Sequence, residues 1–136
     1  MINISGFSKQ QPKLLRGSKK LAAHLGIDVD LTIRKIKETR KDKYGFAYHV
    51  DDLRGIIIFK DCPIDKLSIV IAHEFVHVHQ ELRGDMKFDY KTQTFYWKGE
   101  IYNLERLATL DYYDRPWEAE AKKLEKKLAE SFFMST

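Results

Sequence analysis

The sequence predicts one α+β domain covering residues 1–136, and three observations support this fold class. Apolar and polar residues alternate over residues 29–34, which is the two-residue period of a strand. Two short apolar-rich runs flank Asp51 and Asp52, which predicts a hairpin with these residues in its turn. Longer segments repeat apolar residues every three or four positions, the period of an amphipathic helix. We therefore expect a small antiparallel sheet packed on a central helix, with one further helix at each end of the chain.

The boundaries of the expected elements follow from these periods and from residues that start or stop helices. Gly26 and Gly84 are expected to end the first two helices, and Pro63 is expected at the first helical position of the second. Residues 56–59 are apolar on both faces, so this strand is expected to be buried between neighbouring strands and a helix. In chain order, we expect a helix over residues 9–25, strands over 29–34, 44–50 and 54–59, a helix over 63–83, strands over 86–90 and 94–102 with a bend at 97–100, and a helix over 115–132.

The composition is that of a globular protein with its own core. Hydrophobic residues make up 43% of the chain and charged residues 32%. No apolar run reaches the length of about eighteen residues that a membrane span needs, and the N-terminal residues show no leader pattern, so we expect a cytoplasmic protein without a membrane partner. Cys62 is the only cysteine, which excludes an internal disulfide and a cysteine-based zinc site. Any metal is therefore expected to be held by histidines and carboxylates.

The central helix carries the motif that directs the functional interpretation, His73-Glu74-Phe75-Val76-His77. Residues four apart lie on one face of a helix, so His73 and His77 are expected to reach one metal ion, with Glu74 beside them as a base. A single buried histidine is more often a core residue, but burying all three side chains would leave three polar groups to satisfy. The motif therefore favours a zinc hydrolase. His79 projects about 160° away from His77 and is not expected to bind the same ion.

A catalytic zinc site needs a third protein ligand. No histidine follows His79, and Arg83 occupies the position at which some zinc peptidases carry a third histidine. The third ligand is therefore expected to be a carboxylate, preferably one on a helix, where the backbone holds it rigidly. Glu118 and Glu120 lie near the start of the last predicted helix, on either side of its apolar face. Periodicity alone leaves both of them open.

A family resemblance favours one of the two glutamates. The motif at residues 73–77, followed by Trp117-Glu118-Ala119-Glu120-Ala121, resembles the gluzincin branch of the zincin metallopeptidases. The segments Trp97-x-Gly99 and Pro116 to Ala121 are also similar to small stand-alone metallopeptidase-like proteins of bacteria and phages, over about residues 54–124. The resemblance implies that Glu118 is the third ligand. Lys122 departs from the pattern, because many gluzincins have an Asp or Asn there that supports a ligating histidine, so a different support is expected.

The resemblance also implies a function. We expect a zinc-dependent metallopeptidase in which His73, His77 and Glu118 hold Zn²⁺ and Glu74 is the general base. In zincins the strand before the metal helix commonly binds the peptide or protein substrate in an extended form, which here indicates Gly55 through Phe59. A donor to the developing oxyanion is expected among four candidates that the sequence does not rank: Tyr102, Tyr112, Tyr113 and Arg115.

An alternative function rests on the distribution of charge. Residues 1–60 carry 13 Lys and Arg against 6 Asp and Glu, whereas residues 61–136 carry 11 against 14. A basic half of this kind is most often a solvated surface, but it also suits nucleic acid as a partner. The alternative is therefore a zincin-like binding or regulatory protein that associates with nucleic acid. The sequence predicts neither the substrate nor the oligomeric state.

Overall fold

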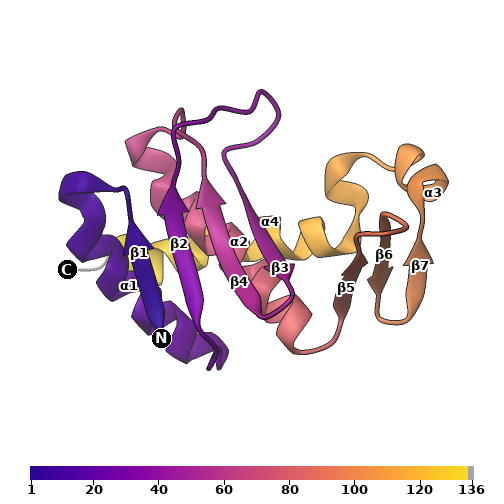
Figure 1. Cartoon of the computed structure of the whole chain (residues 1–136), viewed down its shortest axis with the longest axis horizontal. Helices are drawn as coiled ribbons and strands as arrows, with labels where there is room; N and C mark the ends of the chain where they lie inside the picture. The colour runs from indigo at the N-terminus through magenta and orange to yellow at the C-terminus, as the bar shows by residue number, and fades with distance from the viewer. Residues whose placement is uncertain (135–136) are drawn as a thin grey trace.

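The structure, a computed structural model, describes residues 1–134, and it confirms the predicted α+β class. It consists of two sheets, three long helices and one short helix (Figure 1). The elements are β1 (Ile2–Ser5), α1 (Gln11–Leu25), β2 (Leu31–Lys35), β3 (Gly45–Val50), β4 (Leu53–Ile58), α2 (Leu67–Leu82), β5 (Met86–Asp89), β6 (Thr94–Trp97), β7 (Glu100–Tyr102), α3 (Leu104–Ala108) and α4 (Pro116–Ala129).

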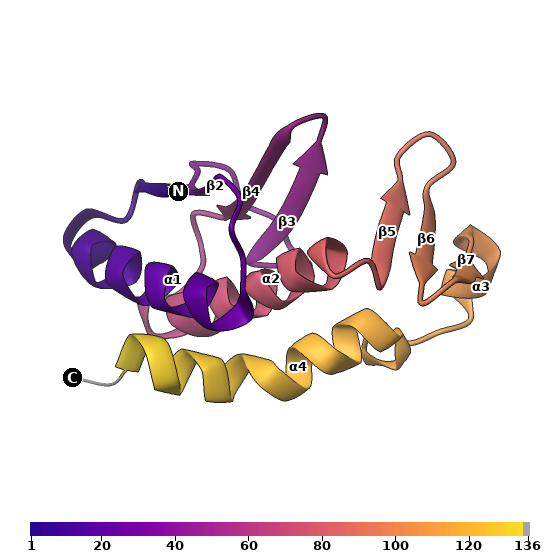
Figure 2. The same ribbon diagram turned by 90° about the horizontal axis from the view of Figure 1, so that it is seen from below.

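The long helices form a layer beneath the larger sheet. α1, α2 and α4 all lie on one face of the sheet formed by β1 to β4 (Figure 2). α2 packs against both this sheet and α4. The smaller sheet of β5 to β7 lies at the far end of α2, beside the first turn of α4 (Figure 1, Figure 2). Within residues 1–134, no helix combines the length and the apolar character needed to cross a bilayer.

The larger sheet is mixed, so the predicted antiparallel arrangement is wrong for it. Its strand order is β1-β2-β4-β3, with β1 parallel to β2, β2 parallel to β4, and only the β3–β4 hairpin antiparallel. α1 carries the chain from the end of β1 back to the start of β2, which makes that pair parallel. The prediction missed β1, a strand of only 4 residues. The smaller sheet is antiparallel, in the order β5-β6-β7.

The main core lies between the larger sheet and the helices. Ile33, Ile56, Ile71 and Phe75 are each 0% exposed and belong to one apolar cluster. The prediction that residues 56–59 are buried is confirmed, since β4 has a strand on each side and α2 beneath it. Burial of this apolar surface is the main stabilising contribution to the fold, and it fixes α2 against the sheet.

Three helix boundaries differ from the prediction. α1 begins at Gln11 after a 3₁₀ turn, although it ends as predicted at Gly26, which has a left-handed φ of 69°. Pro63 is extended, its carbonyl oxygen accepts from Lys66 N at 3.0 Å in a 3₁₀ turn, and α2 starts only at Leu67. α4 ends at Ala129, and the chain continues as a π-helical turn over 130–134. These turns satisfy backbone groups that an α-helix leaves open at its ends.

Candidate metal centre

The predicted metal-binding histidines lie together on α2. His73 and His77 are one helical turn apart, their ring centroids are 4.8 Å apart, and the rings meet edge to face. Their Nε2 atoms are separated by 3.2 Å. His77 is buried and His73 nearly so. Helix geometry therefore places both imidazole nitrogens at one point, as predicted from the spacing.

α4 brings Glu118 to the same point. Glu118 Oε1 lies 2.9 Å from His73 Nε2 and 3.0 Å from His77 Nε2. Zinc bonds of 2.0–2.2 Å in a tetrahedral site would separate ligand atoms by about 3.3–3.6 Å, so small side-chain shifts would fit the three atoms around one ion. A metal site needs at least three His, Cys, Asp or Glu side chains whose donor atoms lie close together. Among residues 1–134, His73, His77 and Glu118 form the one group that meets this condition.

The second nitrogen of each imidazole has a hydrogen-bond acceptor. His73 Nδ1 donates to Glu125 Oε1 at 3.0 Å, and His77 Nδ1 donates to Gln80 Oε1 at 2.8 Å. Gln80 presents its oxygen because its amide nitrogen donates to the Trp117 carbonyl oxygen at 2.9 Å. A proton on each Nδ1 leaves the lone pair of each Nε2 directed at Glu118. Three acceptors that converge in this way fit a cation.

The electrostatics of the cluster also favour positive charge. Burial disfavours the imidazolium form of His73, but the hydrogen bond to Glu118 and the charge of Glu74 more than offset it and raise the pKa to about 9. Burial likewise opposes ionisation of Glu118, yet hydrogen bonds from His73 and His77 hold the pKa of its carboxyl below the usual range. Protons on the histidines therefore supply the positive charge when no metal is bound.

The structure separates the two glutamates that periodicity left open. Glu120 lies away from the histidines, and its carboxylate accepts from Arg83 Nη2 at 2.7 Å and 2.9 Å. Gln80 Nε2 also donates to Glu120 Oε1 at 3.0 Å. Glu120 therefore supports Gln80, which in turn orients His77, whereas Glu118 faces the Nε2 atoms.

The side chains that support the histidines were not predicted. Lys122 occupies the position at which many gluzincins have a supporting Asp or Asn. In this structure the support for His73 comes instead from Glu125, on the next turn of α4. Glu125 follows Glu118 by seven residues and Gln80 follows His77 by three, and both spacings place the pair on one helix face. These spacings are the signal in the sequence from which Glu125 and Gln80 could have been predicted as supporting residues.

An aromatic cluster fixes the turn of α4 that carries Glu118. Trp117 is 2% exposed, its ring stacks on Phe95 at 4.9 Å with an interplanar angle of 13°, and Tyr102 meets it edge-on at 5.1 Å. Trp97 completes the cluster with a centroid distance of 6.4 Å. The sheet of β5 to β7 thus holds Trp117, and Trp117 sets the position of its neighbour Glu118.

Glu74, the predicted base, is buried beside the cluster. Only 6% of its surface is exposed, and burial raises the pKa of its carboxyl, an effect that the charges of His77 and His73 partly offset. It lies one residue after His73 on α2, so it neighbours both histidines and Glu118 without being part of the convergent group. This is a suitable environment for a carboxylate that accepts a proton.

One of the four candidate oxyanion donors lies at the cluster. The Tyr112 hydroxyl lies near Glu118, and burial together with the charge of Glu118 raises the pKa of this phenol. Glu74 contributes to the same shift, so the hydroxyl lies near the base as well. Tyr112 therefore stays protonated at neutral pH and can donate a hydrogen bond there.

The other three candidates have other contacts. Tyr102 packs against Trp117, and the Tyr113 ring lies 5.4 Å from Lys122 Nζ. The Arg115 guanidinium lies 5.7 Å from the centre of the Tyr112 ring. Tyr113 and Arg115 thus lie beside the Tyr112 ring, whereas Tyr102 belongs to the aromatic cluster.

A cavity of about 1130 Å³ runs along the edge of the larger sheet, and His77 lines it. Residues of β3, including Ala47 and His49, line the same cavity. The expectation that Gly55 through Phe59 binds substrate is wrong, because β4 is hydrogen-bonded to β2 on one side and to β3 on the other. β3 is the edge strand on the side of this cavity, so its outer backbone groups are open to an extended peptide there.

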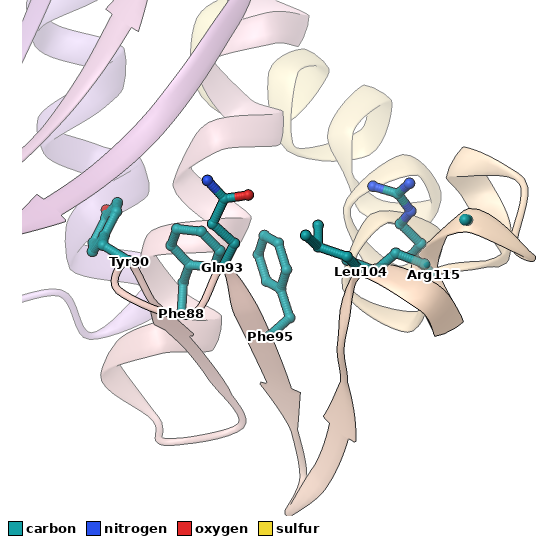
Figure 3. A pocket seen from close by; sticks show the side chains of 8 residues that line it. Phe88, Tyr90, Gln93, Phe95, Leu104 and Arg115 are labelled. Atoms are coloured by element: carbon teal, nitrogen blue, oxygen red, sulfur yellow. The ribbon is translucent and has the colours of Figure 1, made fainter.

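A second, smaller pocket of about 480 Å³ adjoins this cavity (Figure 3). The two share Phe88, Tyr90 and Phe95. The rings of Phe88 and Phe95 lie side by side in it, with Leu104 and Arg115 on the α3 side (Figure 3). Its walls are mainly apolar. Phe95, which lines the pocket, stacks on Trp117, so the pocket lies close to the turn of α4 that carries Glu118.

Comparison with known proteins adds no relative: no family model, no curated protein and no solved structure matches this chain. The gluzincin resemblance therefore rests on the sequence motifs.

Proposed function

We propose that the chain is a zinc-dependent peptidase with a gluzincin-like site and a zincin-like arrangement of sheet and metal helix. The observation that carries this proposal is the convergence of His73 Nε2, His77 Nε2 and Glu118 Oε1 within 3.2 Å of one another, with a hydrogen-bond partner at the Nδ1 of each imidazole. Two imidazoles and one carboxylate are the donor set of many catalytic zinc sites, which keep a further position open for water or substrate.

Zinc held by this set would supply Lewis-acid activation of a peptide carbonyl and of the attacking water. Glu74 would take the proton of that water and pass it to the leaving amine, a role suited to its raised pKa. Tyr112 would donate its hydroxyl proton in a hydrogen bond to the oxyanion that forms on the carbonyl. Each role uses a side chain that lies at the cluster.

The cavity indicates how a peptide would bind. An extended segment would pair with the free edge of β3, where main-chain hydrogen bonds are independent of side-chain identity. The adjoining pocket lined by Phe88, Phe95 and Leu104 would take a large apolar side chain of the substrate. The proposed substrate is thus an unstructured peptide with at least one large apolar residue near the scissile bond.

The proposal is tested by hydrolysis of quenched fluorogenic peptides with zinc-loaded protein. We expect Glu74→Gln to lower kcat/KM by about two to four orders of magnitude, because it keeps the shape of the side chain but removes the base. Its zinc content and its thermal unfolding should match those of the unchanged protein. Glu105→Gln, an exposed change on α3, is the matched control and should retain full activity. Equal hydrolysis by the Glu74→Gln protein would refute the proposal.

A further inference from the structure

The larger sheet has one face that no helix of residues 1–134 covers. α1 and α2 pack on its other face, and α4 packs on α2 on that same side of the sheet (Figure 1, Figure 2). Side chains alternate along a strand, and Ile33, Ile56 and Ile58 point into the core between sheet and helices. The residues between them face outward. This open face carries Thr32, Arg34, Phe46, Tyr48, Gly55 and Ile57.

The open face presents aromatic rings. Tyr48 pairs with Gly55 across β3 and β4, and its ring lies over that glycine, since a Cβ there would be 2.5 Å from Tyr48 Cζ. Any side chain at position 55 would displace the ring. Phe46 lies on the same face, with its ring centroid 6.4 Å from that of Tyr48 and 5.7 Å from that of Phe59. The sheet thus forms a platform on which planar groups can stack.

Cations border these rings. Residues 34–43 contain six Lys and Arg against two acids, Glu38 and Asp42. Lys43 Nζ lies 5.8 Å from the Phe46 ring centre, and the Arg40 guanidinium lies 5.9 Å from that of Phe59. These cations line the same cavity as the two outward rings. The pairing of Arg40 with Asp42 at 3.6 Å is exposed and weak, so most of the positive charge is uncompensated.

We propose that this face binds single-stranded nucleic acid. Bases would stack on Phe46 and Tyr48, while Arg34, Arg40 and Lys43 would contact phosphates. An acidic peptide matches the cations but leaves the ring faces unused, and a duplex hides the faces of its bases, so a single strand is the partner that uses both features. The basic N-terminal half predicted from the sequence acquires a specific surface in this way.

This proposal is independent of the peptidase proposal. The open face contains no candidate metal ligand, so nucleic-acid binding is expected to persist in EDTA and in the Glu118→Ala protein. The cavity that borders the face also contains His77, so a bound strand would lie beside the candidate metal centre. Loss of peptidase activity and loss of nucleic-acid binding are therefore separable by experiment.

Fluorescence anisotropy with a labelled twenty-nucleotide oligothymidine at low salt tests the proposal. For about three phosphate contacts, affinity should fall roughly 20-fold between 50 and 200 mM salt, as counterion release requires. Arg34→Glu with Lys43→Glu should weaken binding more than about tenfold. Tyr48→Leu, which keeps an apolar side chain but removes the ring, should weaken it about fivefold or more. Thermal melts of each variant verify that it is folded.

The matched control reverses the same amount of charge elsewhere. Lys19 and Lys20 are exposed on α1, in the helix layer opposite the open face, and Lys19→Glu with Lys20→Glu should change affinity less than about threefold. Absence of binding at low salt would overturn the proposal. It would also be overturned if the control pair weakened binding as much as the Arg34 and Lys43 pair, or if polyglutamate displaced the oligonucleotide as well as unlabelled oligothymidine does.

Discussion

The two halves of the candidate metal centre are held by different means. His73, Glu74 and His77 belong to one turn of α2, so helix geometry sets their spacing. Glu118 follows His77 by 41 residues and reaches it only because α4 packs beside α2. Its position depends on Trp117 in the aromatic cluster of the smaller sheet. Metal binding and folding should therefore be coupled mainly through the α4 half.

The strongest test of this contrast is Trp117→Ala. Removing a buried tryptophan should lower the free energy of unfolding by about 3–5 kcal/mol, and it should also release Glu118 from its position. We expect zinc affinity to fall together with stability in denaturant titrations and metal competition assays. Ile101→Ala is the control, because Ile101 lies on β7 of the same sheet but is 57% exposed, and its stability should change by less than about 0.5 kcal/mol. Unchanged zinc affinity in Trp117→Ala would show that the cluster does not position Glu118.

Removal of the ligands compares the halves directly. His77→Ala and Glu118→Ala should each weaken zinc binding more than about 100-fold, a larger effect than loss of a supporting residue. Glu120→Ala should weaken it far less, because Glu120 contacts Arg83 and Gln80. Competition with a chromogenic chelator measures each affinity. Loss of zinc in Glu120→Ala but not in Glu118→Ala would reverse the assignment.

The supporting residues should have intermediate effects in both halves. Glu125→Leu and Gln80→Leu each remove the acceptor for one Nδ1–H, so zinc affinity should fall about 10- to 100-fold. Gln80→Leu should also lower stability, because it leaves the buried Trp117 carbonyl without its donor. Equal zinc affinity in the unchanged protein and Glu125→Leu would mean that His73 needs no orienting partner.

The smallest predicted effect is on the pH dependence of the metal-free protein. The pKa of His73 rises from an unfolded value of 6.5 to about 9, so its stabilisation is complete below pH 6.5 and is lost as the pH rises through 9. The lowered pKa of Glu118 has the opposite sign, and its contribution is lost only in acid. In EDTA, the Tm of the unchanged protein should therefore fall between pH 6 and pH 9.5 by about 3 °C or more beyond the fall seen in Glu118→Gln over the same range. A parallel decline in both proteins would exclude the coupling.

The same contrast explains which features the sequence predicted. Local spacing was sufficient to place His73 and His77 on one side of a helix with Glu74 beside them, and to predict helix ends such as Gly26. The choice between Glu118 and Glu120 required the rotation of α4 about its axis, which is set by contacts of Trp117 with strands distant in sequence. Periodicity carries no information on such contacts.

Strand order was unpredictable for a similar reason. Alternation identifies a strand and its buried face but not its neighbours. β1 has only 4 residues, too few for a clear period, and without it the parallel pairing through α1 was not visible. The position of β4 inside the sheet, which excludes it as a substrate-binding edge, depends on the same unpredicted order.

Anomalous diffraction at the zinc edge from crystals of the zinc-loaded protein is the most direct test of the metal centre. We predict one peak per chain at the point where His73, His77 and Glu118 converge, about 2.0–2.2 Å from both Nε2 atoms and from the Glu118 carboxylate. Glu74 should lie outside bonding distance of the peak. A peak at another position, ligation by Glu120 in place of Glu118, or no peak after soaking in zinc would contradict the account.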